Sequence, residues 1–445
     1  MEEPREELQG EAVARVAAID IAKNSGVVCL RLPNENREGT RTQRVWTVAS
    51  TTNAIVELGD HLVCQGVELV VMEATGAYWR PIYYLLESRG LRCWLVNARQ
   101  VKNVPGRPKT DKLDAVWLAK LTERGMVRPS FVPPPPKPVR HLRDFTRTRT
   151  VFVHERTRHK LRVDKVLQDA QIKLSSVATD SLGVSGRAMM EAPIAGERNP
   201  RTLANLAQGR LTAKHDALVE ALTGQFDEHH ARLLRLLLAT VDHLTAQIAT
   251  LDQEIAAALA ALPDPRSDVS APSQPTGTSF GAVLLARLDE IPGVGPTSAR
   301  VILAEIGPDM SIFPTPAHLA SWAKLCPRTI QSGAKSTTGP AGKGNAWLKG
   351  ALGEAASAAA RTDTFLGARY RRLVKRRGHA KALVAVARSI LVIVWHLIND
   401  PQVRYQELGP DWHQRHLNPQ RKTRDLVRQL EHLGHHVTLA PTSAA

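Results

Sequence analysis

The chain has 445 residues, which is too long for one small domain and sufficient for two or three. Lys and Arg outnumber Asp and Glu by 59 to 43, and the formal net charge of +16 predicts attraction to a polyanion, either nucleic acid or an anionic membrane surface. A membrane protein is not expected, because the longest apolar run, Ala382 to Ile398, is interrupted by Arg388, Ser389 and His396.

Residues 13 to 125 alternate between strand-like and helix-like runs. Apolar runs over 13–21 and 27–32 flank turn residues and predict a β-hairpin, which a third strand over 44–49 follows. Helices are then expected over 51–65, 78–88 and 110–124, and strands over 68–72 and 91–96. The order β-β-β-α-β-α-β-α predicts an α/β domain with a mixed sheet over 10–130.

A run of four prolines at 133–136 predicts a stiff linker, and the next predicted region is an arm over 137–262. It consists of a basic helix over 139–174, a segment over 176–210 expected to be an irregular insertion, and one long helix over 211–262. Apolar residues from Leu234 to Leu262 recur in steps of three and four, which predicts a coiled coil. The pattern leaves open whether this coil pairs within one chain or between chains.

After a second linker over 263–279, a mainly α-helical domain is expected over 280–400, followed by a basic tail over 401–445 that is peripheral or partly disordered. The segment Ile291 to Arg300 has the form of a helix-hairpin-helix. Gly293 and Gly295 would allow its tight turn, and the N–H groups that start its second helix could hold phosphate, with Arg300 nearby. An ordinary Gly/Pro turn is the alternative.

Four carboxylates are candidates for a metal site. Asp20 lies within an apolar strand, Glu73 ends another strand, and Asp111 and Asp114 share one face of a helix. If these elements converge at one sheet edge, the acids would repel each other unless divalent cations lie between them. The set suits two Mg²⁺ ions that activate the attacking oxygen and stabilise the leaving oxygen of a phosphodiester. Each acid alone could instead be a turn residue, a helix cap or an ion-pair partner.

Basic residues around the predicted start of the last helix fit a phosphate backbone that passes the acids, although a solvated face would have the same composition. They are Arg99, Lys102, Arg107, Lys109 and Lys112.

A segment over 325–345 is rich in Gly, Ser, Thr and cations. Ser332 is a candidate nucleophile there, with Arg328, Lys335 and Lys343 as candidate phosphate contacts. No His or Asp of the segment supplies an evident general base.

Two sets of motifs together resemble a known family. Asp20 to Lys23, Glu73 to Gly76 and Lys109 to Ala115 resemble the N-terminal DEDD domain of the bacterial insertion-sequence transposases whose type elements are numbered one-ten and eleven-eleven. Residues 291–306, 319–327 and 331–345 resemble that family's C-terminal transposase domain. The resemblance covers about 13–125 and 285–375.

The resemblance implies a RuvC-like domain of the RNase H fold, which binds Mg²⁺ through the four acids, and a bacterial cytoplasmic location. It implies that Ser332 is a nucleophile that attaches covalently to DNA, and that a structured non-coding guide RNA pairs with donor and target DNA. The protein would act as a homo-oligomer, a dimer or tetramer, and its arm would hold RNA. The arm residues expected to contact nucleic acid are Arg143, Arg147, Arg156, Arg158 and Lys160.

The sequence also departs from the family pattern, since Ala334 stands where a second glycine is usual. The leading hypothesis is a DNA transposase, a site-specific recombinase. A RuvC-like structure-selective endonuclease, in which the acids alone hydrolyse DNA, is one alternative. An inactive nucleic-acid-binding remnant is the other.

Overall fold

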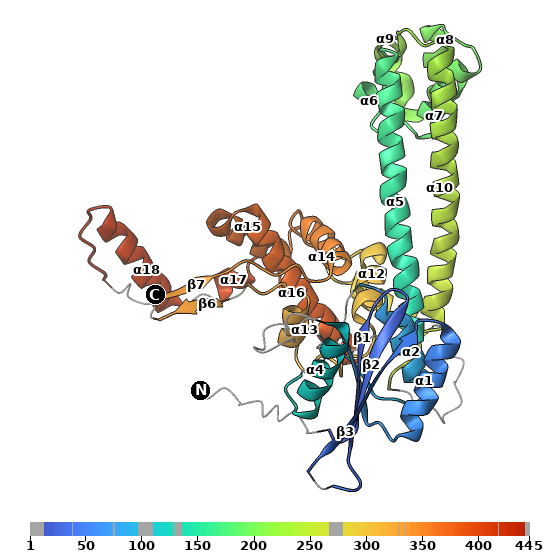
Figure 1. Cartoon of the computed structure of the whole chain (residues 1–445). Helices are drawn as coiled ribbons and strands as arrows, with labels where there is room; N and C mark the ends of the chain where they lie inside the picture. The colour runs from blue at the N-terminus through green and yellow to red at the C-terminus, as the bar shows by residue number, and fades with distance from the viewer. Residues whose placement is uncertain are drawn as a thin grey trace. The chain divides into compact units, whose positions relative to one another are not determined.

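The computed structural model describes residues 13–37, 39–73, 76–96, 110–127, 129, 136–266, 279–327, 329–333, 335–416 and 418–440, without the side chains of residues 111, 338 and 421. Contacts divide the chain into two compact units, Met1–Pro134 and Pro135–Ala445. Figure 1 shows the elements of both units, each of which is described by itself.

The first unit contains a five-stranded mixed sheet, as predicted, in the order β3-β2-β1-β4-β5. Strands β1, β2 and β3 form an antiparallel meander, while β4 and β5 continue the sheet parallel to β1. The third strand begins three residues earlier than predicted. The bounds are β1 Val16–Ile21, β2 Ser25–Pro33, β3 Arg41–Ala49, β4 Leu69–Glu73 and β5 Cys93–Val96.

Helices cover both faces of this sheet. Helices α1 (Thr52–Cys64) and α2 (Trp79–Ser88) pack on one face, where Ile19 and Met72 belong to their shared apolar core. Helix α4 (Asp111–Glu123) packs on the other face against a core that includes Ala18 and Val71. Alternate residues of each strand therefore point to opposite helical layers.

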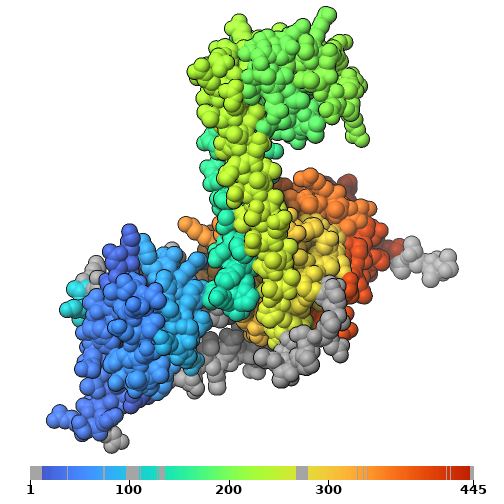
Figure 2. Space-filling view, turned by 90° about the vertical axis from the view of Figure 1, so that its right-hand side faces the viewer, coloured from blue at the N-terminus to red at the C-terminus, as the bar shows by residue number. Residues whose placement is uncertain are grey.

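The arm in the second unit is a two-helix hairpin made by one chain. Helix α5 (Lys137–Asp169) and helix α10 (Glu228–Ala260) are antiparallel, since Arg149 pairs with Asp252 at 2.8 Å near one end and Asp169 contacts His230 at 3.2 Å at the other. Figure 2 shows the arm as a rod with a bulky tip. The structure thus assigns the predicted coiled coil to pairing within the chain.

The tip corrects two predictions, because residues 176–210 are not irregular and 211–262 is not one helix. Five short helices form an apolar core between the ends of α5 and α10. The predicted long helix is interrupted between Leu222 and Glu228, and within this break a Cβ on Gly224 would lie 2.4 Å from the carbonyl oxygen of Ala170. The helices of the tip are α6 Leu174–Val177, α7 Val184–Ile194, α8 Pro200–Ala204, η1 Gly209–Lys214 and α9 His215–Leu222.

The rest of the second unit is largely helical, as predicted. One β-hairpin, β6 (Thr329–Ser332) with β7 (Lys335–Thr338), lies between α13 and α14 in the chain. The helices are α11 Phe280–Asp289, α12 Pro296–Ile306, α13 Pro316–Trp322, α14 Ala346–Ala359, α15 Phe365–Arg377, α16 His379–Asn399, α17 Trp412–Arg415 and α18 Pro419–His432.

Helix α16 is the one helix of the described residues that is long and apolar enough to cross a membrane, although the sequence prediction had set it aside. It packs against α11, α13, α14 and α15, and its apolar face from Ala382 to Ile398 is buried. The core helix of a soluble protein passes the same test of length and composition, so α16 is weak evidence for a membrane span.

The beginning of the tail is held against α11 and α15, whereas the sequence predicted a peripheral or partly disordered segment. The guanidinium group of Arg287 donates to the carbonyl oxygen of Asp400 at 2.7 Å and to that of Val403. The carboxylate of Glu407 accepts the backbone N–H of Phe365 at 2.7 Å. These bonds between distant parts of the chain are invisible in the composition of the tail.

Candidate functional site

The sheet places Asp20 and Glu73 side by side. Strands β1 and β4 are parallel neighbours, and their register runs to the pair Ile19 and Met72, directly before the two acids. Neighbouring strands lie about 4.8 Å apart, so the acids end adjacent strands at the same edge. Because Ile19 and Met72 face α1 and α2, the alternation of side chains directs both acids towards the layer of α4.

Helix α4, which covers the same face of the sheet, carries Asp114. The predicted N-cap is confirmed, since Thr110 Oγ1 accepts the N–H of Leu113 at 3.4 Å. Asp114 precedes Ala115, which is buried against the sheet, and therefore lies at the edge of the packed stripe. At the other end of α4, the carboxylate of Glu123 binds Arg31 of β2 and Arg41 of β3, each at 2.7 Å. These two ion pairs fix the helix across the antiparallel half of the sheet.

The structure describes the side chains of three of the four predicted acids. Asp20, Glu73 and Asp114 are all partly buried. Each has an interaction partner, so none is a free carboxylate. The side chain of Asp111 lies outside the described residues. Among the side chains that are described, no three His, Cys, Asp or Glu lie close enough to hold a metal ion. The donor chemistry suits Mg²⁺, which prefers oxygen ligands, but the described carboxylates do not form a metal centre by themselves.

Of the basic residues expected beside the acids, Lys112 is exposed on α4. Arg99, Lys102, Arg107 and Lys109 lie outside the described residues. Their contact with a phosphate backbone stays a prediction.

Ser332 lies in a β-hairpin within the Gly- and Ser-rich segment. It pairs with Lys335 across a turn in which Gly333 has a φ of +58°, a conformation that glycine adopts at little cost. The whole of β6 is exposed, and so are Lys335 and Lys343. Arg328 lies outside the described residues. Within the part of the chain that is described, no hydrogen bond to the Ser332 hydroxyl identifies a general base.

A buried carboxylate that the sequence analysis missed organises the base of the arm. The side chain of Glu305, on α12, is fully buried. Arg147 donates to its two oxygens at 2.7 and 2.8 Å, and Asn345 Nδ2 donates to Oε2 at 2.6 Å. A single acid in the apolar run 301–306 is the signal that could have found it, because a buried charge needs partners.

Arg143 and Arg147 were predicted to contact nucleic acid, and the structure shows both of them bonded to the segment around Glu305; a nucleic-acid contact of either stays a prediction. Besides the bonds from Arg147, the guanidinium group of Arg143 lies 3.5 Å from Glu305 and donates to the carbonyl oxygens of Ala304 and Glu305 at 3.0 and 2.8 Å. Both arginines therefore neutralise the buried acid and attach α5 to α12.

The turn between α11 and α12, where the sequence predicted a helix-hairpin-helix, packs inwards. A Cβ on Gly293 would lie 2.3 Å from the carbonyl oxygen of Ala355 on α14, whereas a Cβ on Gly295 would meet nothing within 4 Å. Arg300 binds Asp252 of α10 at 3.1 Å. Gly293 and Arg300 are thus used in packing, and phosphate binding by this turn stays a prediction.

The remaining predicted contacts are on the arm. Arg156 makes one bond of 3.3 Å to Thr245, and the exposed Arg158 lies 3.8 Å from Glu155. Lys160 is partly buried. These three cations are held less firmly than Arg143 and Arg147, so they stay candidates for nucleic-acid contacts.

Two family models match the sequence. The DEDD model of IS110 elements, described as a transposase, matches residues 17–172, and the model described as the transposase IS116/IS110/IS902 family matches residues 285–371. A curated relative, the insertion element IS110 uncharacterized 43.6 kDa protein of Streptomyces coelicolor, is 36% identical over 116 residues, which are 25% of this chain and 28% of the relative. The chain thus spans less than a third of that relative.

The two models match separate regions in the predicted order, one containing the four acids and the other Ser332. Together they cover more than half of the sequence. The chain belongs to the IS110 family of transposases.

Proposed function

We propose that this protein is a DNA transposase that cleaves and rejoins the strands of an insertion sequence. The observation that carries the proposal is the placement of Asp20 and Glu73 on the ends of adjacent parallel strands, on the face covered by α4 and Asp114. The net charge of +16 provides the attraction to a polyanionic substrate.

The sheet supports the assignment of the first unit to the RNase H/RuvC-like folds. Its order is β3-β2-β1-β4-β5, with β2 antiparallel to β1 and with acids at the carboxyl ends of the central strands. In α/β sheets, functional groups collect at the carboxyl ends of the strands. If the acids lay at the opposite edge of the sheet, they would be distant from the start of α4.

We propose that Asp20, Glu73, Asp111 and Asp114 would hold Mg²⁺. When bound, the metal would supply Lewis-acid stabilisation of the oxygens that enter and leave the phosphorus atom. The chain's own contribution is to orient the carboxylates. The Thr110 cap fixes the first turn of α4, and the ion pairs of Glu123 fix its last turn.

Ser332 is proposed as the nucleophile of the strand-transfer step. Its hydroxyl oxygen would form a phosphodiester bond with DNA while a sugar oxygen leaves, and a second strand end would later displace the serine. Exposure of β6 and the adjacent Lys335 support this role, because a strand of DNA can reach the hydroxyl and a cation lies beside it.

A structured guide RNA and a homo-oligomer complete the proposal. Arg156, Arg158 and Lys160 are the arm residues proposed to hold RNA. The family assignment supports this pairing of an arm with nucleic acid, while the stoichiometry awaits measurement of the mass of the complex.

The deciding experiment compares Ser332→Ala with Ser336→Ala, because both serines are exposed in the same hairpin. Purified protein, Mg²⁺, RNA from the flanking region and a donor plasmid with both element ends are incubated and analysed on denaturing gels and by junction sequencing. We expect Ser336→Ala to yield covalent protein–DNA species and recombined junctions, and Ser332→Ala to yield neither. Junctions formed by Ser332→Ala would exclude the serine mechanism and favour a structure-selective endonuclease.

The metal site is tested with Asp20→Asn and Glu73→Gln against Asp60→Asn, an exposed acid of α1. Mn²⁺ binding, followed by electron paramagnetic resonance, is expected to weaken at least tenfold in the first two variants and to be unchanged in the third. If Mn²⁺ binding were the same in all three variants and neither they nor the unaltered protein cleaved DNA, the protein would be the inactive nucleic-acid-binding remnant.

A further inference from the structure

Helix α15 carries an unusual concentration of positive charge on its exposed face. In the described part of the chain, Arg371 pairs with Asp363 at 2.9 Å, and no carboxylate lies within ion-pair distance of the helix's other cations. Arg371, Arg372, Lys375 and Arg376 are spaced i, i+1, i+4 and i+5, so they lie on one side of the helix. This row of guanidinium and ammonium groups is largely unneutralised.

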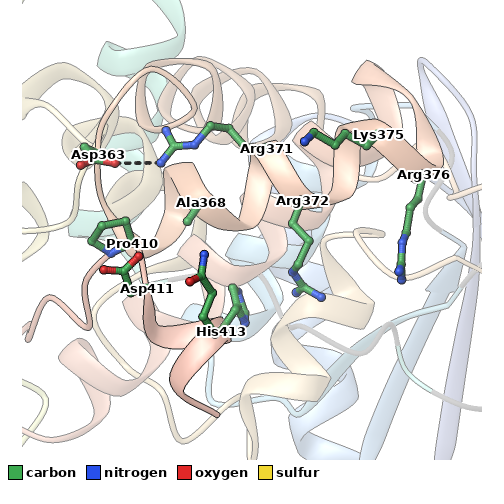
Figure 3. A pocket seen from close by; sticks show the side chains of 10 residues that line it. Asp363, Ala368, Arg371, Arg372, Lys375, Arg376, Pro410, Asp411 and His413 are labelled. Atoms are coloured by element: carbon green, nitrogen blue, oxygen red, sulfur yellow. Dashed lines mark hydrogen bonds and ion pairs between the residues drawn. The ribbon is translucent and has the colours of Figure 1, made fainter. Parts of the chain in front are cut away.

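The row lines a groove whose opposite wall is the first part of the tail. One cavity of about 660 Å³ is lined by Arg372 and Arg376 of α15 and by Pro410, Asp411 and His413 of the tail. Figure 3 shows the four cations along the helix, with Pro410, Asp411 and His413 below it. A second cavity of about 640 Å³ shares Arg372, Arg376 and His413 and extends to Lys422 of α18. We call this continuous depression the tail groove.

The wall formed by the tail is built by specific contacts. Phe365, at the start of α15, packs against Trp412 and His413 with ring centroids 5.3 and 5.0 Å apart. Glu407 accepts the N–H of Phe365 at 2.7 Å and the hydroxyl of Tyr405 at 2.6 Å. The rings of Trp412 and His416 stack with centroids 4.3 Å apart. The groove is therefore held open by its own architecture.

The charges in and below the tail groove repel each other. Burial lowers the pKa of Arg369, and the neighbouring cations Arg372 and Arg388 lower it further. Burial also lowers the pKa of His413, with added effects of Arg372 and Arg369. Among the described residues, the buried Nε of Arg369 and Nε2 of His413 have no hydrogen-bond partner. A bound anion would relieve this repulsion.

We propose that the tail groove binds the phosphodiester backbone of a single nucleic-acid strand. The lining cations, which continue from Arg371 to Lys422, outnumber the lining carboxylates Asp363, Asp411 and Asp425, and they match successive phosphates of a strand better than one small anion. The ring of His416, which lines the second cavity and stacks on Trp412, offers a surface for a base. The choice of nucleic acid among polyanions rests on the proposed function. Residues beyond 371 lie outside the two family matches, so most of the tail groove lies outside the matched regions.

The test uses the full chain with the charge-removing double variant Arg372→Gln/Arg376→Gln. Its matched control is Arg377→Gln/Lys381→Gln, which removes two exposed cations that do not line the groove. Fluorescence anisotropy with labelled 20-nucleotide single strands, in DNA and RNA arms, gives Kd across a salt series without Mg²⁺. Binding then requires neither the acids nor Ser332, so failure of the recombination chemistry leaves this result unaffected.

We expect the groove variant to weaken binding at least tenfold at 0.1 M salt and to reduce the slope of log K against log salt by about 1.4, since each phosphate contact of a single strand contributes roughly 0.7. The control should keep the slope. Binding of the strand should also quench the fluorescence of Trp412, which is obtained as the difference from Trp412→Phe. Equal slopes for groove variant and control, or displacement of the strand by millimolar inorganic phosphate, would overturn the proposal. The DNA and RNA arms decide which strand the tail groove prefers.

Discussion

Arg147 on the arm binds both carboxylate oxygens of Glu305, with nitrogen–oxygen distances of 2.7 and 2.8 Å. The same carboxylate accepts Asn345 Nδ2 at 2.6 Å, and the side chain of Asn345 caps the first turn of α14. One buried acid therefore joins α5, α12 and the segment that follows the Ser332 hairpin. An ion pair of this kind is costly to break from one side.

Removal of this acid should destabilise the second unit strongly. In Glu305→Ala, Arg143 and Arg147 would keep their charges but lose the carboxylate that neutralises them, so we expect a loss of about 3–5 kcal/mol in the free energy of unfolding. Urea denaturation monitored by circular dichroism measures it. The control is Glu354→Gln, because Glu354 is exposed on α14. Equal midpoints for the two variants would mean that the carboxylate contributes nothing to the attachment of the arm.

The two glycines of the hairpin turn should differ sharply. Gly293→Ala brings a methyl group to 2.3 Å from the Ala355 carbonyl oxygen at a φ of +86°, so we expect a loss of at least about 2 kcal/mol. Gly295→Ala meets open space and should change stability little. Thermal denaturation compares them. The DNA affinity of the stable Gly295→Ala variant then tests whether the turn binds phosphate. An unchanged affinity would contradict phosphate binding by the turn.

Basic residues of the arm should differ in how much they contribute to the stability of the protein. Arg147→Gln should lower the stability of the protein through the loss of its bonds to Glu305. The double variant Arg158→Gln/Lys160→Gln should leave stability within about 0.5 kcal/mol, because these cations have little or no pairing in the described structure. It should reduce the salt dependence of RNA binding by about one unit per lost phosphate contact. A full salt slope in this variant would place the RNA elsewhere.

A fall in pH should release the tail from α11 and α15. A hydrogen bond from Arg404 lowers the pKa of Glu290, and in Glu407 the opposing effect of burial is outweighed by hydrogen bonds from Tyr405 and the Phe365 N–H. Depressed carboxyl pKa values contribute stability that is complete above the ordinary value of 4.5 and is lost as pH falls below it. Fluorescence of Trp412, obtained as the difference from Trp412→Phe, should change in this range. In Glu407→Gln this change should be smaller, because one of the two acid-sensitive groups is then absent.

The sheet and the acidic residues were predictable because their signals are local. Apolar runs with turn residues between them specify β1 to β5, and the acids interrupt or end those runs. The tip of the arm was missed for the opposite reason. Gly186 lies in the segment predicted to be irregular and Gly224 in the predicted long helix, but each allows close contact with a backbone carbonyl group, of Ser181 and of Ala170. Such contacts depend on tertiary packing.

The assignment of cations was less predictable. A count of Lys and Arg shows that the arm is basic, but the partner of Arg147 lies 158 residues away in the sequence. Arg300 likewise finds Asp252 on another helix. The tail groove was also missed, because its two walls come from α15 and from residues after 409. Only the folded chain shows which cations are already paired and which still face solvent.

The hairpin of α5 and α10 also has a mechanical consequence. Each helix has 33 residues, so at about 1.5 Å per residue the arm is roughly 50 Å long. That length corresponds to about fifteen base pairs of duplex at 3.4 Å each. Because both helices belong to one chain, this distance is built into every monomer before any partner arrives. Deleting seven residues from each helix would bring the tip about 10 Å closer to its root and shorten the reach by three base pairs.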